Sequence, residues 1–355
     1  MRPASFLRSL PLLVSTAAIV APSAAADGRE PGSVLVHPYH EAGLVLPDVD
    51  EEGEGGDLVQ LPVGGMGPIQ AVFNVVSVTN TNRTAATDVH FQYVNVSASP
   101  NPFLFADCTI ADRVETLTPA DTLSVLTSCH NSAFNASGYL VISAMDPNQV
   151  DTYWAFDHLV GSSQLVTAAG GMYSLNAIPF TSPQAEFADT DLDGDGRRDF
   201  DGVEYEGIAD ELYMDSFIGA LSGDLVLASL LGGEYLVNVD FVIYNDDEFQ
   251  LSAQYSFACW TKVPLSTISG FFTNQGLATT VNDDRELDLD CDGVADIETG
   301  WAIVRPTTAV SPTSANIANP AVLGAVTNAS TPWNNGRLLW ESVAKQTNGA
   351  FPAAN

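Results

Sequence analysis

Short runs in which apolar and polar residues alternate recur along this chain. Residues 75–79 and 89–94 are typical, with valine, phenylalanine or tyrosine at alternate positions. Successive side chains of a strand point to opposite faces, so this period of two predicts strands. Further runs span 122–126, 138–144, 164–167, 173–178, 235–244, 250–257, 300–304 and 337–340. Helical periodicity is scarce; its best instance, residues 208–221, fits strands equally well, so the pattern predicts an all-β protein.

Parts of this pattern occur twice. Residues 75–94 predict a strand, a hairpin or bulged turn at Asn80–Asn82, and a second strand. They resemble residues 239–257, and each segment precedes a cysteine. Likewise 138–142 and 159–161 resemble 300–304 and 323–325. Chance likeness among β proteins is the alternative explanation. We expect two tandem antiparallel β-sandwich (immunoglobulin-like) domains, at 33–185 and 205–350, joined by a calcium-binding linker loop at 186–204.

The first 26 residues predict a signal peptide. Arg2 and Arg8 precede an apolar run that extends to Val20, and small residues follow up to Ala26. This is the three-part pattern of a cleaved secretory signal, and the apolar run is shorter than the roughly 20 residues that span a bilayer. No later run reaches that length. We therefore expect a secreted chain, periplasmic, extracellular or at the cell surface, without a transmembrane segment.

Charge narrows the possible partners. The chain has 12 basic and 44 acidic residues, a formal net charge of −32. Binding to nucleic acid needs a basic face, so nucleic acid is not an expected partner. Such acidity suits a salty or calcium-containing medium, or serves solubility alone. Residues 47–57 predict a solvated acidic loop, alternatively a cation-binding patch, and residues 316–332 predict further loops.

Four cysteines in an exported chain predict two disulfides. They are Cys108, Cys129, Cys259 and Cys291, which allow three connectivities. Pairing Cys108 with Cys129 and Cys259 with Cys291 is preferred, because each bond then closes a short loop within one domain.

Two loops share the pattern D-x-D-x-D-G-x-x-D. Their aspartates are Asp191, Asp193, Asp195 and Asp199 in the first loop and Asp288, Asp290, Asp292 and Asp296 in the second. Alternate residues bring carboxylates around one hard cation, and the glycine permits the sharp turn. The four carboxylates would repel one another without a divalent cation. We expect these eight residues to bind calcium.

The loops differ from those of helix-loop-helix sensors. Gly202 and Thr299 stand at the twelfth position, where a sensor has glutamate. The pattern is similar to the calcium loops of thrombospondin type 3 repeats, which implies structural calcium. An empty acidic turn and a catalytic metal are the alternatives. Magnesium fits less well, because it prefers a rigid six-ligand shell with several waters.

Residues with catalytic potential form no recognisable motif, and whether the chain is an enzyme stays open. The five histidines, His37, His40, His90, His130 and His158, have no helical metal spacing. Gly161-Ser162-Ser163 lacks the strand-turn-helix setting of a nucleophile. Among the tryptophans, Trp260 and Trp301 are expected in the core, and Trp333 is the best candidate for an exposed sugar-stacking side chain.

Several segments resemble a group of uncharacterised secreted bacterial proteins. They are VHFQYV at 89–94 with LTPADT at 117–122, HLVG at 158–161, DGVEYE at 201–206, and FVIYNDDE at 241–248 with FACW at 257–260. The similarity covers most of the chain after the signal. It implies a two-domain exported β architecture and brings no known activity; the acidic insertion at 48–57 departs from it.

These expectations favour a non-enzymatic, calcium-stabilised structural, adhesive or surface-binding protein. Its partner would be a cell-surface component, a polysaccharide or another copy of itself. The strand at 33–36 could pair with a neighbouring molecule, although pairing within the chain is the simpler arrangement. The alternative function is a secreted polysaccharide-active enzyme or a carbohydrate-binding module.

Overall fold

The computed structural model describes most of the chain after the predicted signal. The described residues are 30–42, 73–96, 108–133, 136–166, 172–219, 223–231, 234–245, 248–278, 288, 291, 297–330, 333–346 and 349–351. The signal at 1–26 and the acidic loop at 47–57 lie outside them. Strands dominate, and the helices of the described part are single turns: α1 (Thr127–His130), α2 (Leu265–Ile268), η1 (Gly270–Phe272) and α3 (Asn274–Leu277). The all-β prediction is confirmed.

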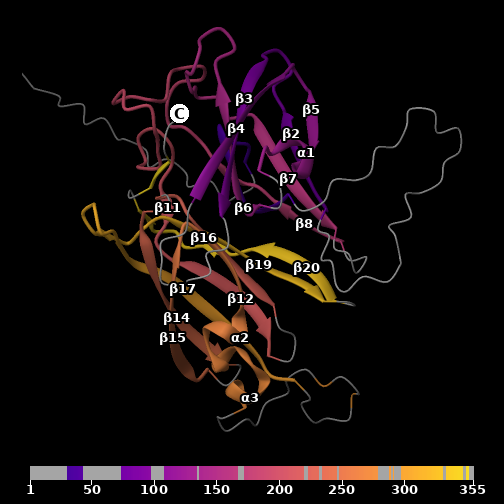
Figure 1. The fold of residues 1–355 in the computed structure, drawn as a ribbon, viewed down its shortest axis with the longest axis vertical. Coiled ribbons are helices and arrows are strands. Elements are labelled where there is room, and N and C mark those ends of the chain that lie inside the picture. Colours follow the sequence, from indigo (N-terminus) through magenta and orange to yellow (C-terminus); the bar gives the residue numbers. More distant parts are fainter. Residues whose placement is uncertain are drawn as a thin grey trace, which may run out of the picture.

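The N-terminal half forms two antiparallel sheets, indigo to magenta in Figure 1. One has the order β4-β3-β6-β1-β9. Its strands are β1 (Val34–Glu41), β3 (Thr87–Val96), β4 (Cys108–Leu117), β6 (Ser137–Met145) and β9 (Ile178–Phe180). The other has the order β5-β2-β7-β8. Its strands are β2 (Phe73–Asn80), β5 (Thr122–Leu126), β7 (Leu159–Val166) and β8 (Met172–Asn176).

The C-terminal half, orange to yellow, also forms two antiparallel sheets. The larger has the order β15-β14-β17-β12-β21, with β18 beside β17. Its strands are β12 (Leu212–Ile218), β14 (Leu236–Asn245), β15 (Gln250–Ala258), β17 (Thr299–Val310), β18 (Ile317–Ala318) and β21 (Trp340–Glu341). The smaller has the order β16-β13-β19-β20. Its strands are β13 (Asp224–Ser229), β16 (Trp260–Pro264), β19 (Val322–Ser330) and β20 (Trp333–Leu338).

The two halves have the same strand order. In the N-terminal half the strands of the two sheets have the orders 4-3-6-1-9 and 5-2-7-8. When the strands of the C-terminal half are renumbered with β12 as the first and β18 left out, its two sheets have the same two orders. The predicted matches of 138–142 with 300–304 (β6 and β17) and of 159–161 with 323–325 (β7 and β19) agree with this order. The match of 75–94 with 239–257 is wrong, because the β14–β15 hairpin corresponds to β3 and β4. The immunoglobulin-like detail and the domain boundaries stay predictions.

Several local expectations are corrected. The residues Asn80–Asn82 connect β2 and β3, which belong to different sheets, so they form no hairpin. Residues 208–221 contain strands, β11 (Ile208–Ala209) and β12, and no helix. The predicted loop at 316–332 contains β18 and β19. Its small residues suit tight packing, since a Cβ on Gly324 would lie 2.8 Å from Leu339 Cδ1.

The first strand occupies an interior place. β1 pairs with β6 on one side and with β9 on the other, and its residues from Val34 to His40 are buried. A strand with both edges paired has no free backbone groups to offer another molecule. The suggestion that residues 33–36 pair with a neighbouring copy is therefore wrong, and the pairing is within the chain.

Each half encloses a hydrophobic core between its two sheets, and a further cluster joins the halves. This joining cluster contains Val36 and Tyr139 of the N-terminal half with Ala228 and Leu323 of the C-terminal half. Hydrogen bonds accompany it, such as that from Trp260 Nε1 to the Pro38 carbonyl at 2.8 Å. Dry packing of this kind fixes the two halves against each other.

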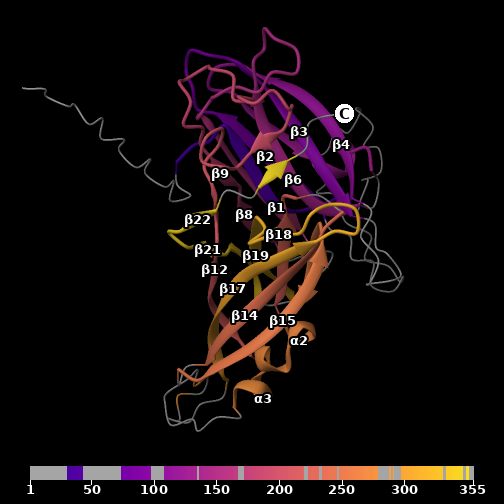
Figure 2. The ribbon, with the colours of Figure 1, turned by 90° about the vertical axis from the view of Figure 1, so that its left-hand side faces the viewer.

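Short strand pairs connect the linker to the far end of the described chain. β10 (Arg198–Asp199) pairs with β23 (Ala350–Phe351), and β11 pairs with β22 (Lys345–Gln346). Figure 2 shows β22 close to β21, at the level where the two halves meet. The linker is thus part of the fold rather than a free connection.

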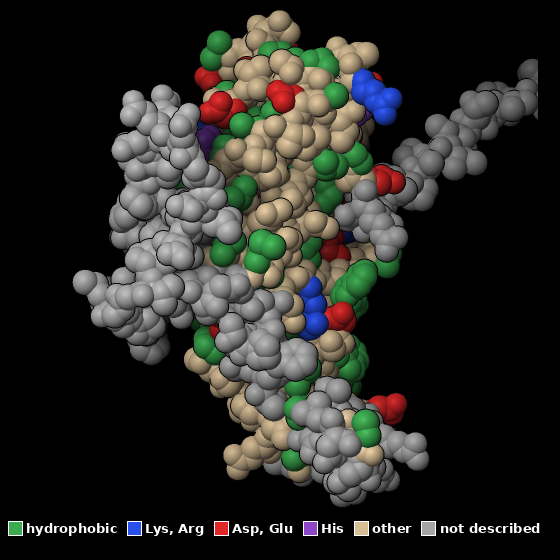
Figure 3. All heavy atoms as spheres, turned by 90° about the vertical axis from the view of Figure 1, so that its right-hand side faces the viewer, with side chains coloured by type: hydrophobic (Ala, Val, Ile, Leu, Met, Phe, Trp, Pro, Cys, Tyr) green, Lys and Arg blue, Asp and Glu red, His purple; other side chains and the backbone are tan. Residues whose placement is uncertain are grey.

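On the side of the molecule seen in Figure 3, Asp and Glu of the described residues are scattered among other side chains. None of the helices in the described part is long and apolar enough to cross a membrane.

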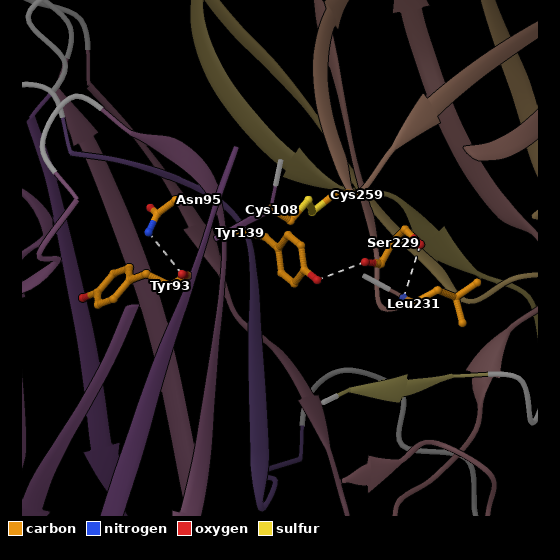
Figure 4. Close-up of a disulfide and its surroundings, with 7 residues drawn as sticks. All are labelled: Tyr93, Asn95, Cys108, Tyr139, Ser229, Leu231 and Cys259. Atoms are coloured by element: carbon orange, nitrogen blue, oxygen red, sulfur yellow. Dashed lines mark hydrogen bonds between the residues drawn. A yellow bond between two sulfur atoms is a disulfide. The ribbon is translucent and has the colours of Figure 1, made fainter. Parts of the chain in front are cut away.

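The disulfide connects the two halves. Cys108, at the start of β4, is bonded to Cys259, at the corner between β15 and β16, with a Cα–Cα distance of 6.5 Å (Figure 4). Cys129 and Cys291 are exposed and unpaired. The preferred pairing of Cys108 with Cys129 and of Cys259 with Cys291 is therefore wrong. A short loop favours a bond between cysteines that are close in sequence. Here the packing of the two halves places Cys259 against β4 instead, where Cys259 has no exposed surface.

Candidate metal centre

The first aspartate loop brings three carboxylates together. One carboxylate oxygen from each of Asp191, Asp193 and Asp195 lies within 4.8 Å of the others. The loop lies between β9 and β10, in the linker between the two halves. Such a group of hard oxygen donors can hold a divalent metal ion.

Hydrogen bonds from the backbone shape this loop. Asp191 Oδ1 accepts from the Gly194 amide at 2.9 Å, and its Oδ2 accepts from the Gly196 amide at 3.0 Å. Asp193 and Asp195 accept in the same way from the amides two residues later. Gly194 and Gly196 both have φ of 76°, a left-handed conformation that glycine adopts without strain. The loop therefore wraps around its carboxylates.

Asp199 stands at the ninth position and borders the cluster. Its Oδ1 is buried without a hydrogen-bond partner among the described residues. Burial raises the pKa of Asp199, and the negative charges of Asp195, Asp193 and Asp201 raise it further. A buried carboxylate oxygen that lacks a donor fits a cation ligand, because a cation would supply the missing partner.

Glu204, which lies outside the aspartate motif, also holds the loop through hydrogen bonds. It is 4% exposed, and its two carboxylate oxygens accept from the amides of Leu192, at 2.7 Å, and Asp199, at 3.1 Å. Burial raises the pKa of Glu204, although both hydrogen bonds oppose the rise. The only sequence signal was a further acidic residue after the ninth position, which has no fixed place in the motif.

The flanks of the loop are buried where the two halves meet. Thr190 Oγ1 and Tyr205 Oη lie 2.8 Å apart, and Phe200 and Tyr205 belong to the cluster that joins the halves. Buried flanks on both sides hold the loop in one conformation, which lowers the entropy lost on binding an ion.

Arg198 fastens the loop to the first sheet. Its side chain is fully buried, and it donates from Nη1 to Ser143 Oγ at 3.0 Å and from Nη2 to Gln92 Oε1. Its guanidinium lies 4.5 Å from the ring centre of Tyr153. Burial lowers the pKa of Arg198, and neighbouring tyrosines and an aspartate oppose this. A charged group held in this way ties the ninth position of the loop to strands β3 and β6.

The second aspartate loop lies largely outside the described residues. Asp288 and the exposed Cys291 are described, whereas Asp290, Asp292 and Asp296 are not. Calcium binding by this loop stays a prediction.

The histidines do not assemble into a metal site within the described residues. His37 and His40 are buried at a bulge in β1. Burial lowers the pKa of His37 to about 3, with help from His40. It lowers the pKa of His40 to about 4, against an opposing contribution from the Val94 carbonyl. Both rings are therefore neutral at physiological pH.

His90 and the serines of β7, which were also considered as catalytic residues, have contacts that stabilise the fold. His90 bridges Tyr153 Oη, at 2.8 Å, and Asp112 Oδ1, at 3.0 Å. Ser162 and Ser163 lie in the middle of β7, where the chain makes no nucleophile turn.

The tryptophans are distributed differently from the expectation. Trp301 is exposed, so its assignment to the core is wrong, and Trp340 is exposed as well. Trp260 is half-buried and stacks on Tyr39 at a ring distance of 5.9 Å. The side chain of Trp333 lies outside the described residues.

Fold and site together define an all-β protein with a repeated strand order and, within the part of the chain that the structure describes, an aspartate cluster able to hold a metal ion. No family model, curated protein or solved structure matches the chain. The resemblance to secreted bacterial proteins stays a prediction.

Proposed function

We propose that this chain is an exported, calcium-stabilised protein that serves a structural, adhesive or surface-binding role. The observation that carries the proposal is the first aspartate loop. Its three carboxylates lie within 4.8 Å of one another, on a backbone already folded around them. A loop of this shape needs little rearrangement to accept a cation.

Calcium is the cation that these donors favour. Calcium accepts six to eight oxygen ligands in a flexible geometry, including carboxylates, carbonyls and water. Asp191, Asp193 and Asp195 supply carboxylates, and Asp199, at the ninth position, has a buried oxygen without a hydrogen-bond partner in the described part of the chain. Magnesium demands a stricter octahedron and keeps its waters, so a partly exposed loop suits calcium better.

Export is supported by two features. Residues 1–26 have the pattern of a secretory signal, and the disulfide between Cys108 and Cys259 is of a kind that persists in oxidising compartments. Calcium sites of extracellular modules have Kd values of about 10⁻⁴ to 10⁻³ M. Such values suit the steady calcium concentration of the medium rather than a transient calcium signal. The proposal therefore assigns calcium a stabilising role and no switching role.

The calcium proposal is tested by thermal unfolding. At a calcium concentration tenfold above Kd, one site contributes about 1.4 kcal/mol to the free energy of unfolding. The parent chain should melt higher in calcium than in EDTA. The double variant Asp191→Asn/Asp193→Asn should lose one bound calcium in titration calorimetry and the matching part of the shift.

Asp146→Asn is the matched control. Asp146 also accepts from a backbone amide two residues later, at 2.9 Å, but lies in no carboxylate cluster. The control should keep the full calcium shift. Identical melting curves of the parent in calcium and EDTA would refute calcium binding, and an undiminished shift in the double variant would refute this loop as a site.

The alternative of a polysaccharide-active enzyme has its own test. A reducing-sugar assay with the calcium-loaded chain should show no turnover of neutral polysaccharides. Release of reducing ends that depends on the protein would contradict the non-catalytic role.

A further inference from the structure

One face of the largest sheet carries aromatic side chains toward the solvent. Along β14, β17 and β12 the core takes every second residue, such as Ile243, Ala302 and Met214. The residues between them point to the opposite face. Five of these outward residues and one residue of β21 form a surface that we name the aromatic face. Its members are Tyr213, Val242, Tyr244, Trp301, Ile303 and Trp340. Figure 2 views the molecule with β14, β15 and β17 toward the viewer.

Strand register aligns these side chains in two neighbouring rows. Val242, Ile303, Tyr213 and Trp340 are direct partners across four strands. Tyr244 and Trp301 are partners in the next row, and their rings stack with centres 4.5 Å apart at 11°. Directly paired residues share a face, so the rows form one continuous surface.

This surface is unusual for the outer side of a sheet. An antiparallel sheet with one buried face places polar residues on the other. Here Trp301 is 39% exposed and Trp340 is 60% exposed. The other four residues of the face are half-buried beside them, and exposed aromatic side chains grouped with apolar neighbours can mark a place where another molecule binds.

Polar rows border the aromatic face. In the next row Asp240 is paired with Gln254 and Arg305, and Gln254 Nε2 donates to Asp240 Oδ1 at 2.8 Å. Arg305 Nε in turn donates to Glu211 Oε1 at 2.6 Å. Rows two residues apart along a strand are separated by about 7 Å. Donors and acceptors are thus held at fixed positions beside the rings.

We propose that the aromatic face binds a neutral polysaccharide. Sugar rings present apolar C–H surfaces that pack on flat aromatic rings, while their hydroxyls accept and donate hydrogen bonds to amides, carboxylates and guanidinium groups. The arrangement of aromatic rows beside polar rows matches both properties. This proposal names a partner for the surface-binding role proposed above. It rests on that role and does not depend on calcium binding.

Charge argues against two other occupants. The net charge of −32 repels anionic polysaccharides and also a second copy of the chain. A neutral polymer of hydroxyl groups has no such penalty.

Affinity electrophoresis of the full exported chain tests the proposal. Native gels contain hydroxyethylcellulose, xyloglucan, galactomannan or β-glucan as neutral probes, and alginate as an anionic one. At least one neutral probe should retard the parent. The variant Trp301→Ala/Trp340→Ala should weaken that binding by about tenfold or more, as expected for anchor residues at the centre of an interface.

Met172→Ala is the matched control, because Met172 is 61% exposed on a strand of the other half. It should bind like the parent. Retardation by no neutral probe, retardation by alginate alone, or equal binding by the double tryptophan variant would overturn the proposal. A dimer seen by light scattering that the double variant abolishes would also overturn it, since a second copy would then cover the face. The calcium shift in melting is measured in parallel, so failure of either proposal is recognised separately.

Discussion

Removal of the Cys108–Cys259 bond should cost far more than removal of the other two cysteines. The bond joins residues 151 apart in sequence. In the chain-entropy model, a closed loop of this length restricts the unfolded chain by about 5 kcal/mol. For a chain of this size, that loss corresponds to a fall in Tm of roughly 7 °C. The perturbation is Cys108→Ala/Cys259→Ala, with alanine chosen because Cys259 is fully buried.

The control is Cys129→Ala/Cys291→Ala. Both of these thiols are exposed, so their loss should change the free energy of unfolding by less than about 0.5 kcal/mol. Urea unfolding gives the two free energies, and peptide mapping under non-reducing conditions gives the connectivity. A Cys108–Cys129 peptide, or equal destabilisation by the two double variants, would refute the assignment of the bond.

Three further predictions concern buried groups. The unfolded chain takes up protons at His37 and His40 below pH 6.5, whereas their folded pKa values are about 3 and about 4. The free energy of unfolding should therefore fall from pH 6.5 downward, by about 2 kcal/mol per histidine near pH 5, as urea unfolding across this range would show. Arg198→Ala should cost about 3 kcal/mol and weaken calcium binding, while the exposed neighbour Arg197→Ala costs under about 0.5 kcal/mol; equal losses would contradict the anchoring role. Gly138→Ala should cost about 3 kcal/mol in thermal unfolding, because its Cβ would lie 1.8 Å from a carbonyl oxygen of β3; a parent-like Tm would contradict this contact.

Local patterns predicted the strands well because alternation is a property of a few neighbouring residues. Residues 122–126 were predicted as a strand and form β5 with the same limits. The arrangement of the strands in sheets was harder to predict, because it depends on contacts between residues that are distant in sequence. The turn at Asn80–Asn82 has hairpin chemistry, yet the strands on its two sides enter different sheets. The small residues of β19 resemble a loop in composition, and only tight packing between neighbouring strands explains them.

The candidate sites show the same division. Spacing identified Asp191, Asp193 and Asp195 as a carboxylate cluster, because a loop motif depends on residues that are close in sequence. Glu204 was missed, because its role depends on a turn that returns the chain beneath the loop. Trp301 was assigned to the core on the grounds that tryptophans in strands are usually buried, whereas register places it on the solvent face beside Tyr244.

The pairing of β10 with β23 sets an order of events during synthesis. β10 follows the aspartate loop directly, but its partner strand is made only after the whole C-terminal half. The Phe200 amide likewise donates to the carbonyl of Gly349, at 2.7 Å. A nascent chain therefore emerges with its first aspartate loop incomplete on one side. The pairing that completes the flank of this loop forms only after the second half of the molecule has been made.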